Sequence, residues 1–222
     1  MTKRTVIFDL DGTLADTSGD LIAAANACFR GLGHGDLLDP VADAATAFRG
    51  GRAMLRLGFA RLGGGGEAAV DREFPNLLAA YEADIDRHTM LYPGCADAVE
   101  RLRVAGYAIG ICTNKPEALA EILMTRLGVR DMFASLVGAD TLPTRKPDPA
   151  PYVAAVERAG GTVARSVLIG DTETDRNTSR AVGVPSVLVT FGPDGRGVEA
   201  LAPEALLDHY DELDLVVSRL IG

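Results

Sequence analysis

The sequence contains no tryptophan, only three cysteines, and no apolar run long enough to cross a membrane. A spanning helix needs about 20 consecutive apolar residues. The N-terminal apolar run stops at Asp9, so we expect neither a spanning segment nor a signal peptide. Cys28, Cys95 and Cys112 are widely spaced and form no CxxC pair for zinc or redox chemistry. We therefore expect buried free thiols in a cytoplasmic protein.

Positive charge is also scarce, with 22 Lys and Arg against 31 Asp and Glu and a formal net charge of -9. Surfaces that bind nucleic acids or anionic membranes need clustered Lys and Arg to displace counterions, so we expect neither partner. An anionic substrate would have to meet a local group of cations. The 222 residues, 47% of them hydrophobic, are enough to bury a substantial core.

From about residue 90 onward, short apolar runs alternate with helical segments, which is typical of a parallel sheet covered by helices. An earlier run of this kind precedes Asp9. The five predicted strands cover residues 5–9, 107–112, 136–138, 167–170 and 186–190. We therefore predict an α/β fold with a doubly wound, Rossmann-like and mostly parallel sheet.

Between residues 18 and 88 the apolar residues recur at helical spacing, and no strand is expected. The predicted helices cover residues 18–30 with Ser18 as N-cap, a segment opening at Asp39-Pro40, residues 51–62, and residues 67–88 despite Pro75. We assign residues 1–15 and 90–222 to the α/β core and residues 16–89 to a small helical cap domain. Ligands of such folds bind at the carboxyl ends of the strands, so an insert after the first strand is placed to cover the site.

Asp9 ends the first predicted strand, and Asp11 follows it in a turn. The two carboxyl groups can face one cleft, where one attacks phosphorus and the other gives a proton to the leaving oxygen and later takes one from water. Taken alone, the D-x-D-G-T segment is also compatible with a calcium loop or a solvated acidic turn.

Two further strand ends carry groups that bind phosphoryl oxygens. Thr113 and Asn114 supply a hydroxyl and an amide after the second strand, although either could simply cap a helix. Lys146 precedes Pro147, which favours an extended backbone, and Asp148 with Pro149 is a helix start, so the lysine is presented from a stiff loop. A surface lysine is the alternative.

Asp171 and Asp175 follow the fourth predicted strand and are four residues apart, on one side of a helix start. They could serve only as caps. Gathered beside Asp9, they would repel it, since two unit charges ~4 Å apart cost about 4 kcal/mol at an effective dielectric near 20. A divalent cation removes this repulsion, and a site of oxygen ligands suits Mg²⁺ better than zinc.

These segments, in this order and on these strand ends, resemble the haloacid dehalogenase superfamily of aspartate-nucleophile hydrolases. Thr113-Asn114-Lys115-Pro116 and Lys146-Pro147-Asp148-Pro149 are similar to the phosphoglycolate phosphatase branch. Haloacid dehalogenases themselves lack the second aspartate, so Asp11 favours phosphate chemistry. Arg176, Asn177 and Thr178 depart from relatives, which usually have apolar or small residues there, and we expect that helix to pack on something polar.

The resemblance implies roles for the residues that match. Asp9 would form an aspartyl-phosphate and Asp11 would act as general acid and base. Phosphate binding would fall to Thr113 and Lys146, with Asn114 orienting the phosphoryl group or the substrate. Mg²⁺ would be held by the Asp9 carboxylate, the Asp11 backbone carbonyl and Asp171, with Asp175 assisting directly or through water.

Substrate choice would belong to the cap, where Arg49 and Arg52 flank two glycines. Arg49 could bind a substrate carboxylate, and a solvated surface arginine is equally compatible with the sequence. We expect hydrolysis of a small anionic phosphate monoester, with 2-phosphoglycolate as the first candidate, by a monomer or homodimer. A sugar phosphomutase of the β-phosphoglucomutase type, a phosphatase or pyrophosphatase of other specificity, and a non-catalytic binding module are the alternatives.

Overall fold

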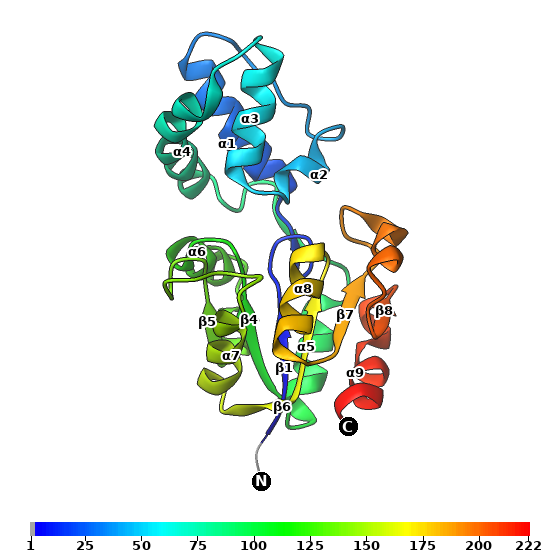
Figure 1. Cartoon of the computed structure of the whole chain (residues 1–222). Helices are drawn as coiled ribbons and strands as arrows, with labels where there is room; N and C mark the ends of the chain where they lie inside the picture. The colour runs from blue at the N-terminus through cyan, green and yellow to red at the C-terminus, as the bar shows by residue number, and fades with distance from the viewer. Residues whose placement is uncertain (1–2) are drawn as a thin grey trace. The chain divides into compact units, whose positions relative to one another are not determined.

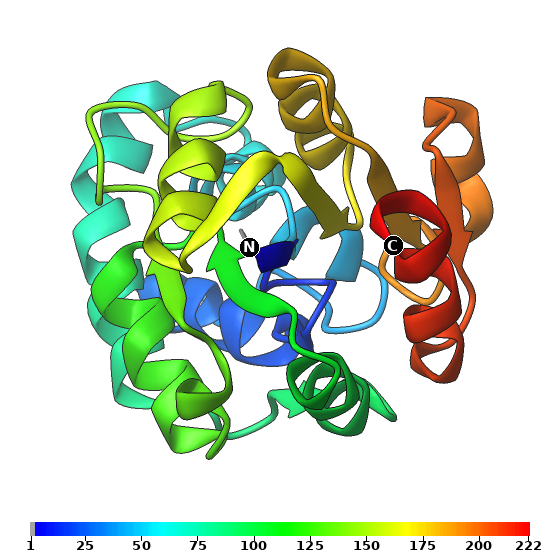
Figure 2. The same ribbon diagram turned by 90° about the horizontal axis from the view of Figure 1, so that it is seen from below.

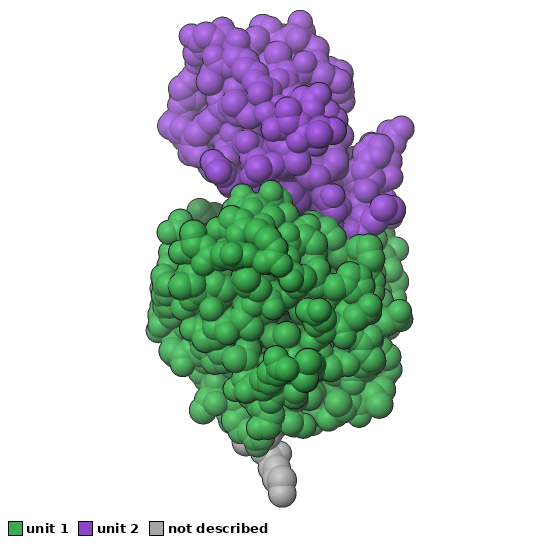
Figure 3. Space-filling view, turned by 90° about the vertical axis from the view of Figure 1, so that its right-hand side faces the viewer, with its two compact units in different colours: residues 1–15, 91–222 green, residues 16–90 purple. Residues whose placement is uncertain are grey.

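The computed structural model describes residues 3–222, which form two compact units (Figures 1 and 3). Unit 1 contains the N-terminal residues through Ala15 together with Leu91–Gly222, and unit 2 contains Asp16–Met90. The chain leaves unit 1 through β2 (Ala15–Asp16) and returns through β3 (Met90–Leu91), and these two strands pair with each other. Within residues 3–222, no helix has both the length and the apolar character that a bilayer crossing demands.

Unit 1 is built on a sheet whose strand order is β5-β4-β1-β6-β7-β8, with every pair parallel. The strands are β1 (Lys3–Phe8), β4 (Ala108–Cys112), β5 (Ser135–Val137), β6 (Gly161–Gly170), β7 (Ser186–Val189) and β8 (Ala205–Leu207). Val6, Ile7 and Phe8 are fully buried, as a central strand covered on both faces requires. The predicted doubly wound α/β fold is confirmed, and β8 is a strand that the sequence does not predict.

Helices cover both faces of this sheet. They are α5 (Cys95–Val104), α6 (Glu117–Arg126), α7 (Pro149–Arg158), α8 (Glu173–Val182) and α9 (Leu213–Ile221), with the short 3-10 helices η1 (Arg130–Met132), η2 (Gly195–Leu201) and η3 (Tyr210–Glu212). Helices α7 and α8 lie on one face, and α5 and α9 lie on the other (Figure 2). The predicted start of α7 is confirmed, because the Asp148 carboxylate accepts the Ala150 N–H at 2.9 Å.

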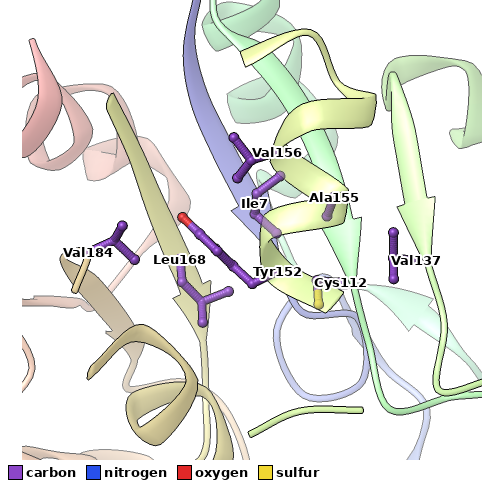
Figure 4. Packing of buried hydrophobic residues seen from close by; sticks show 8 residues of the cluster. All are labelled: Ile7, Cys112, Val137, Tyr152, Ala155, Val156, Leu168 and Val184. Carbon is purple, nitrogen blue, oxygen red and sulfur yellow. The ribbon is translucent and has the colours of Figure 1, made fainter. Parts of the chain in front are cut away.

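One apolar cluster fills the space between α7 and the strands (Figure 4). The ring of Tyr152 is fully buried, and its hydroxyl donates to Ser166 Oγ at 2.8 Å. This bond satisfies the one polar group that the tyrosine brings into the core. The other buried members are Ile7, Cys112, Val137, Ala155, Val156, Leu168 and Val184.

Unit 2 is a helical bundle of α1 (Ser18–Gly31), α2 (Ala44–Ala47), α3 (Gly51–Arg61) and α4 (Gly66–Ala83). Phe29 of α1 meets Phe59 of α3 edge to face, with ring centres 5.3 Å apart. As predicted, no strand lies between residues 18 and 88.

The start of α1 corrects one prediction. Ser18 is the first helical residue and not the N-cap, and Thr17 occupies the cap position, where its side chain accepts no hydrogen bond from the N–H groups of the first turn. The Asp16 carboxylate accepts both the Ser18 N–H at 3.0 Å and the Ser18 hydroxyl at 2.6 Å. The aspartate therefore satisfies the N–H of the first helical residue, one of the groups that an α-helix leaves without an intrahelical acceptor.

Two other helix ends in unit 2 also differ from the prediction. The helix expected from Asp39-Pro40 begins only at Ala44, because the Asp39 carboxylate binds the N–H groups of the next residues in a turn. Helix α4 ends at Ala83 and does not reach residue 88, since the buried Asp20 carboxylate accepts the N–H groups of residues 88 and 89.

Candidate active site

Most of the residues selected from the sequence lie at the carboxyl ends of neighbouring strands in unit 1. The register sets Phe8 beside Ile111 of β4 and Ile169 of β6. Asp9 therefore follows β1 where β4 and β6 also end. Lys146 reaches the same edge from the loop before α7, and Arg49 alone belongs to unit 2.

Asp9 is held in place by two donors and is only 9% exposed. Its Oδ1 accepts the Leu10 N–H at 2.7 Å and lies 3.0 Å from Lys146 Nζ. Burial raises the pKa of Asp9 to about 7, in part against the lowering effect of Lys146, and Asp175 and Asp11 raise it further. Burial and neighbouring acidic groups both disfavour the ionised form of a carboxyl group, and a nearby cation favours it.

The buried side chain of Lys146 lies between two aspartates. Its Nζ lies 2.6 Å from Asp175 Oδ1 in addition to its contact with Asp9, and the side chain is 1% exposed. Burial alone would lower the pKa of Lys146, but Asp175 and then Asp9 outweigh that effect and raise it. The backbone carbonyl of Lys146 accepts Asn114 Nδ2–H at 3.0 Å, so Asn114 holds the loop that presents the lysine.

Asp175 organises the loop after β6 with both carboxylate oxygens. Its Oδ2 accepts the Asp171 N–H at 3.2 Å, the Thr172 N–H at 3.1 Å and the Thr172 hydroxyl at 2.7 Å, in a capping box at the start of α8. A Cβ at Gly170 would lie 2.4 Å from the Asp175 side chain, so only glycine leaves room for it. Since Oδ1 binds Lys146, both oxygens of Asp175 are engaged.

Asp171 is fully buried and has one oxygen without a partner. Its Oδ1 accepts the Thr13 hydroxyl at 2.9 Å, whereas Oδ2 makes no hydrogen bond with any residue in 3–222. Burial raises the pKa of Asp171 well above its usual value, and Asp175 and Asp9 raise it further. An unpaired buried carboxylate oxygen is costly, so Oδ2 is a candidate ligand position.

The donor set fits a small divalent cation. Asp9, Asp171 and Asp175 each offer one carboxylate oxygen within 4.8 Å of the others. Oxygen donors suit Mg²⁺, which keeps part of its water shell and binds one or two carboxylates in proteins. Because the oxygens of Asp175 are engaged, Asp9 and Asp171 are the better candidates for ligands.

Asp11 has a partner that the sequence did not reveal. Its Oδ1 lies 2.8 Å from Nζ of Lys115, whose side chain is 4% exposed. Lys115 belongs to the Thr113-Asn114-Lys115 segment, but the identity of its partner depends on the fold. Thr113 is 3% exposed, and its hydroxyl accepts the Lys115 N–H at 3.1 Å. Helix α6 begins only at Glu117 after Pro116, so neither Thr113 nor Asn114 caps it.

Arg49 lies in the exposed turn between α2 and α3 of unit 2. In residues 3–222 it has no ion pair, whereas Arg52 pairs with Asp71 at 2.5 Å and lies over the Phe74 ring. Of the two arginines that flank the glycines, Arg49 is therefore the one without an ion pair in the described residues.

The polar departure after Asp175 is explained by Arg176, which is 7% exposed. Its guanidinium donates to Ser186 Oγ at 3.0 Å, to Ala202 O at 2.6 Å and to Glu204 Oε2 at 2.7 Å. The expectation that α8 packs on something polar is confirmed: the partners are Ser186 at the start of β7 and the segment that precedes β8.

Comparison with known proteins shows the family to which the chain belongs. The sequence profile of the family described as haloacid dehalogenase-like hydrolase matches residues 6–189. The phosphoglycolate phosphatase of Mesorhizobium japonicum is 36% identical over 225 residues, covering 100% of this chain and 98% of that protein. The phosphoglycolate phosphatase of Xanthomonas campestris pv. campestris strain 8004 is 41% identical over 193 residues, covering 85% of this chain and 84% of that protein.

A crystal structure of a predicted phosphoglycolate phosphatase from Haemophilus somnus shares the fold. It superimposes with a TM-score of 0.85 at 20% identity, over 97% of this chain and 98% of that one. At that identity the likeness concerns the fold alone. The family match and the two relatives confirm the resemblance predicted from the sequence: the chain belongs to the haloacid dehalogenase-like hydrolase family.

Proposed function

We propose that the chain is a Mg²⁺-dependent phosphoric monoester hydrolase that acts on 2-phosphoglycolate through an aspartyl-phosphate at Asp9. The observation that carries the proposal is the buried group of Asp9, Lys146 and Asp171, in which Lys146 Nζ lies 3.0 Å from the proposed nucleophile and Asp171 keeps an unpaired oxygen. The names of the relatives support the choice of substrate.

In the first half-reaction of the proposed mechanism, the Asp9 carboxylate attacks phosphorus and forms the aspartyl-phosphate. Lys146 and the Leu10 N–H fix Oδ1 and thereby orient the carboxylate for attack on phosphorus. We assign Lys146 and the Thr113 hydroxyl to the phosphoryl oxygens, where they would offset the charge of the transferring group. Asn114 serves the same site indirectly, since its side chain binds the backbone of Lys146.

Asp11 is the proposed proton carrier. It gives a proton to the leaving alkoxide and, in the second half-reaction, takes one from the water that attacks the aspartyl-phosphate. Lys115 holds its carboxylate by the 2.8 Å ion pair. The side chain of Asp11 is 19% exposed, which leaves room for its contact with substrate and water.

The proposed Mg²⁺ ligands are the carboxylates of Asp9 and Asp171 and the backbone carbonyl of Asp11. The bound ion would supply positive charge to the phosphoryl oxygens and to the gathered carboxylates. Asp175 acts indirectly in this scheme, because Lys146 and the α8 cap engage both of its oxygens.

Unit 2 is the proposed cap domain, and Arg49 is its proposed contact with the substrate carboxylate. Support comes from its exposure and from the lack of an ion pair with any residue in 3–222. A guanidinium pairs with a carboxylate through two parallel hydrogen bonds, so it would favour 2-phosphoglycolate over uncharged esters. The three buried free thiols support the cytoplasm as the proposed location, and a monomer or homodimer remains the expected form.

The test is phosphate release by the purified chain on a panel of metabolite esters with Mg²⁺. We expect 2-phosphoglycolate to give the highest kcat/KM among hexose phosphates, nucleotides and pyrophosphate. EDTA should stop release and added Mg²⁺ should restore it. A chain that interconverts a hexose phosphate while liberating little phosphate is a mutase, and a rate indifferent to EDTA contradicts the metal assignment.

A further inference from the structure

The C-terminal part of unit 1 contacts the metal-site loop through a fully buried tyrosine. Tyr210 follows β8, and its hydroxyl donates to the backbone carbonyl of Thr13 at 2.7 Å. The Thr13 hydroxyl in turn donates to Asp171 Oδ1 at 2.9 Å. Two hydrogen bonds in series therefore connect Tyr210 to a proposed metal ligand.

The ring of Tyr210 is fixed by an aromatic stack. Phe191 lies between Tyr92 and Tyr210, with ring centres 4.9 Å and 5.2 Å away. A buried ring with neighbours of this kind has little freedom, so its hydroxyl stays within hydrogen-bond distance of the Thr13 carbonyl.

Gly192, the residue after Phe191, packs against the loop that contains Gly12 and Thr13. A Cβ at Gly192 would lie 2.9 Å from the Gly12 carbonyl oxygen and 3.1 Å from Asp171 Cβ. The first distance is shorter than a Cβ tolerates and the second is tighter than most Cβ contacts, so glycine at 192 lets the segment after β7 lie directly against the loop and Asp171.

These contacts decide which oxygen of Asp171 is available. With Oδ1 engaged by the Thr13 hydroxyl, only Oδ2 stays unpaired within residues 3–222. Outer partners of this kind orient a ligand and tune its affinity for a metal. If the Thr13 backbone moved, the carboxylate could rotate and the donor set would lose its arrangement.

We infer that Tyr210 is a positioning residue for the metal site: acting through Thr13, it fixes which oxygen of Asp171 faces the cation, while Gly192 lets the C-terminal segment close on the same loop. The inference rests on the proposed Mg²⁺ site. It adds that residues after β7, which supply no ligand, strengthen Mg²⁺ binding at that site.

The first experiment is calorimetric titration of the purified chain with Mg²⁺ alone. Tyr210→Phe keeps the ring and removes only the hydroxyl, and we expect about fivefold weaker Mg²⁺ binding. The matched control is Tyr152→Phe, which also removes one buried tyrosine hydroxyl bond in unit 1, to Ser166. It should bind Mg²⁺ within about twofold of the unmodified chain, since Tyr152 belongs to the apolar cluster under α7.

A double-mutant cycle tests whether Tyr210 acts through Thr13. Thr13→Val removes the bond to Asp171, and we expect about tenfold weaker Mg²⁺ binding. Adding Tyr210→Phe to Thr13→Val should then weaken binding by less than about twofold. Full additivity of the two losses would contradict the proposed route.

A second pair of variants keeps the test valid if Tyr210→Phe does not fold. In Gly192→Ala the added methyl group would push the Gly12 carbonyl and Asp171 away from residue 192, and Mg²⁺ binding should weaken about fivefold or more. Gly197→Ala is its control, because a Cβ there has no neighbour within 4 Å. Equal Mg²⁺ affinity in this pair would overturn the inference.

Kinetics separate positioning from general damage. In Tyr210→Phe the Mg²⁺ concentration for half-maximal rate should rise about fivefold, while kcat at saturating Mg²⁺ stays within about twofold. If the unmodified chain binds Mg²⁺ and both tyrosine variants bind it equally, the inference fails and the proposed function stands. If the unmodified chain does not bind Mg²⁺, the proposed metal site fails and the inference fails with it.

Discussion

The two units each contain an ion pair with the same 2.6 Å separation in very different surroundings. In unit 1, Lys146 and Asp175 have side chains that are 1% and 0% exposed. In unit 2, Arg56 and Glu67 have side chains that are 51% and 62% exposed. Water solvates and screens the second pair, whereas the first must balance its charges within the protein.

The difference shows where each unit has more charged groups of one sign than partners for them. Unit 1 gathers three buried aspartates, Asp9, Asp171 and Asp175, and Lys146 pairs with two of them, so acidic groups outnumber cations where water is excluded. In unit 2 the arginine side chain of each ion pair is exposed, even where its partner, Asp43 or Glu73, is buried. The arginines of unit 2 that have no ion pair within residues 3–222 are Arg49 and Arg87, both exposed. Chemistry is therefore expected in unit 1, and recognition of an anion in unit 2.

The largest expected effect is on turnover in unit 1. Asp9→Asn should lower kcat more than about 10³-fold, because an amide is neither a nucleophile nor an anionic ligand. The free energy of unfolding should not fall, since Lys146 keeps Asp175 as its partner. Steady-state phosphate release and denaturant unfolding measure the two quantities, and substantial residual turnover would remove Asp9 from its role.

The next effect is on stability and compares the two ion pairs directly. Lys146→Met leaves Asp9 and Asp175 buried without their cation and should lower the free energy of unfolding by about 3–5 kcal/mol. The matched Arg56→Met removes a cation at the same distance from its partner and should cause little change. Urea unfolding of both variants checks this, and similar losses would mean that burial does not distinguish the pairs.

A smaller effect concerns substrate choice by unit 2. Arg49→Ala should raise KM for 2-phosphoglycolate about tenfold and leave KM for p-nitrophenyl phosphate, which has no carboxylate, within about twofold. Arg87→Ala is the control, because Arg87 is also exposed and has no ion pair in residues 3–222. Equal changes with both substrates, or equal changes in both variants, would make Arg49 a surface residue without a role in recognition.

The smallest effect concerns one buried thiol from each unit. Burial raises the pKa of Cys28 in unit 2 to about 11 and that of Cys112 in unit 1 to about 12. The thiolate is the reactive form, so iodoacetamide should modify Cys28 before Cys112, and its rate should rise with pH toward about 11. Peptide mapping after timed labelling measures this order, and earlier labelling of Cys112 would contradict it.

The sequence was most informative where one short segment carries both a structural and a chemical signal. Asp9 follows a buried apolar strand, and Asp171 follows another, so parallel pairing alone brings their strand ends together. Lys115, Thr13 and Tyr210 were not found in this way. The contact from Thr13 to Asp171 spans 158 positions and that from Tyr210 to Thr13 spans 197, and no local pattern encodes such partners.

The fold shows the same limit. Strand β8 has only three residues, and its pairing with Val187–Val189 of β7 decides that it is a strand. The end of α4 depends on Asp20, which lies more than sixty positions before the N–H groups that it binds. Sequence periodicity located the long elements, whereas tertiary partners determined where they end and which short ones form.

The most direct test of the account is to identify the residue that carries the phosphoryl group. Asp11→Asn with p-nitrophenyl phosphate is the suitable combination, because p-nitrophenolate leaves without a proton and the attack of water on the intermediate is slowed. After acid quenching, peptide mass mapping should find the adduct on the peptide that contains Asp9, and the Asp9→Asn, Asp11→Asn double variant should show none. An adduct on another residue, or turnover of the Asp9→Asn enzyme at a rate near that of the unmodified chain, would contradict the account.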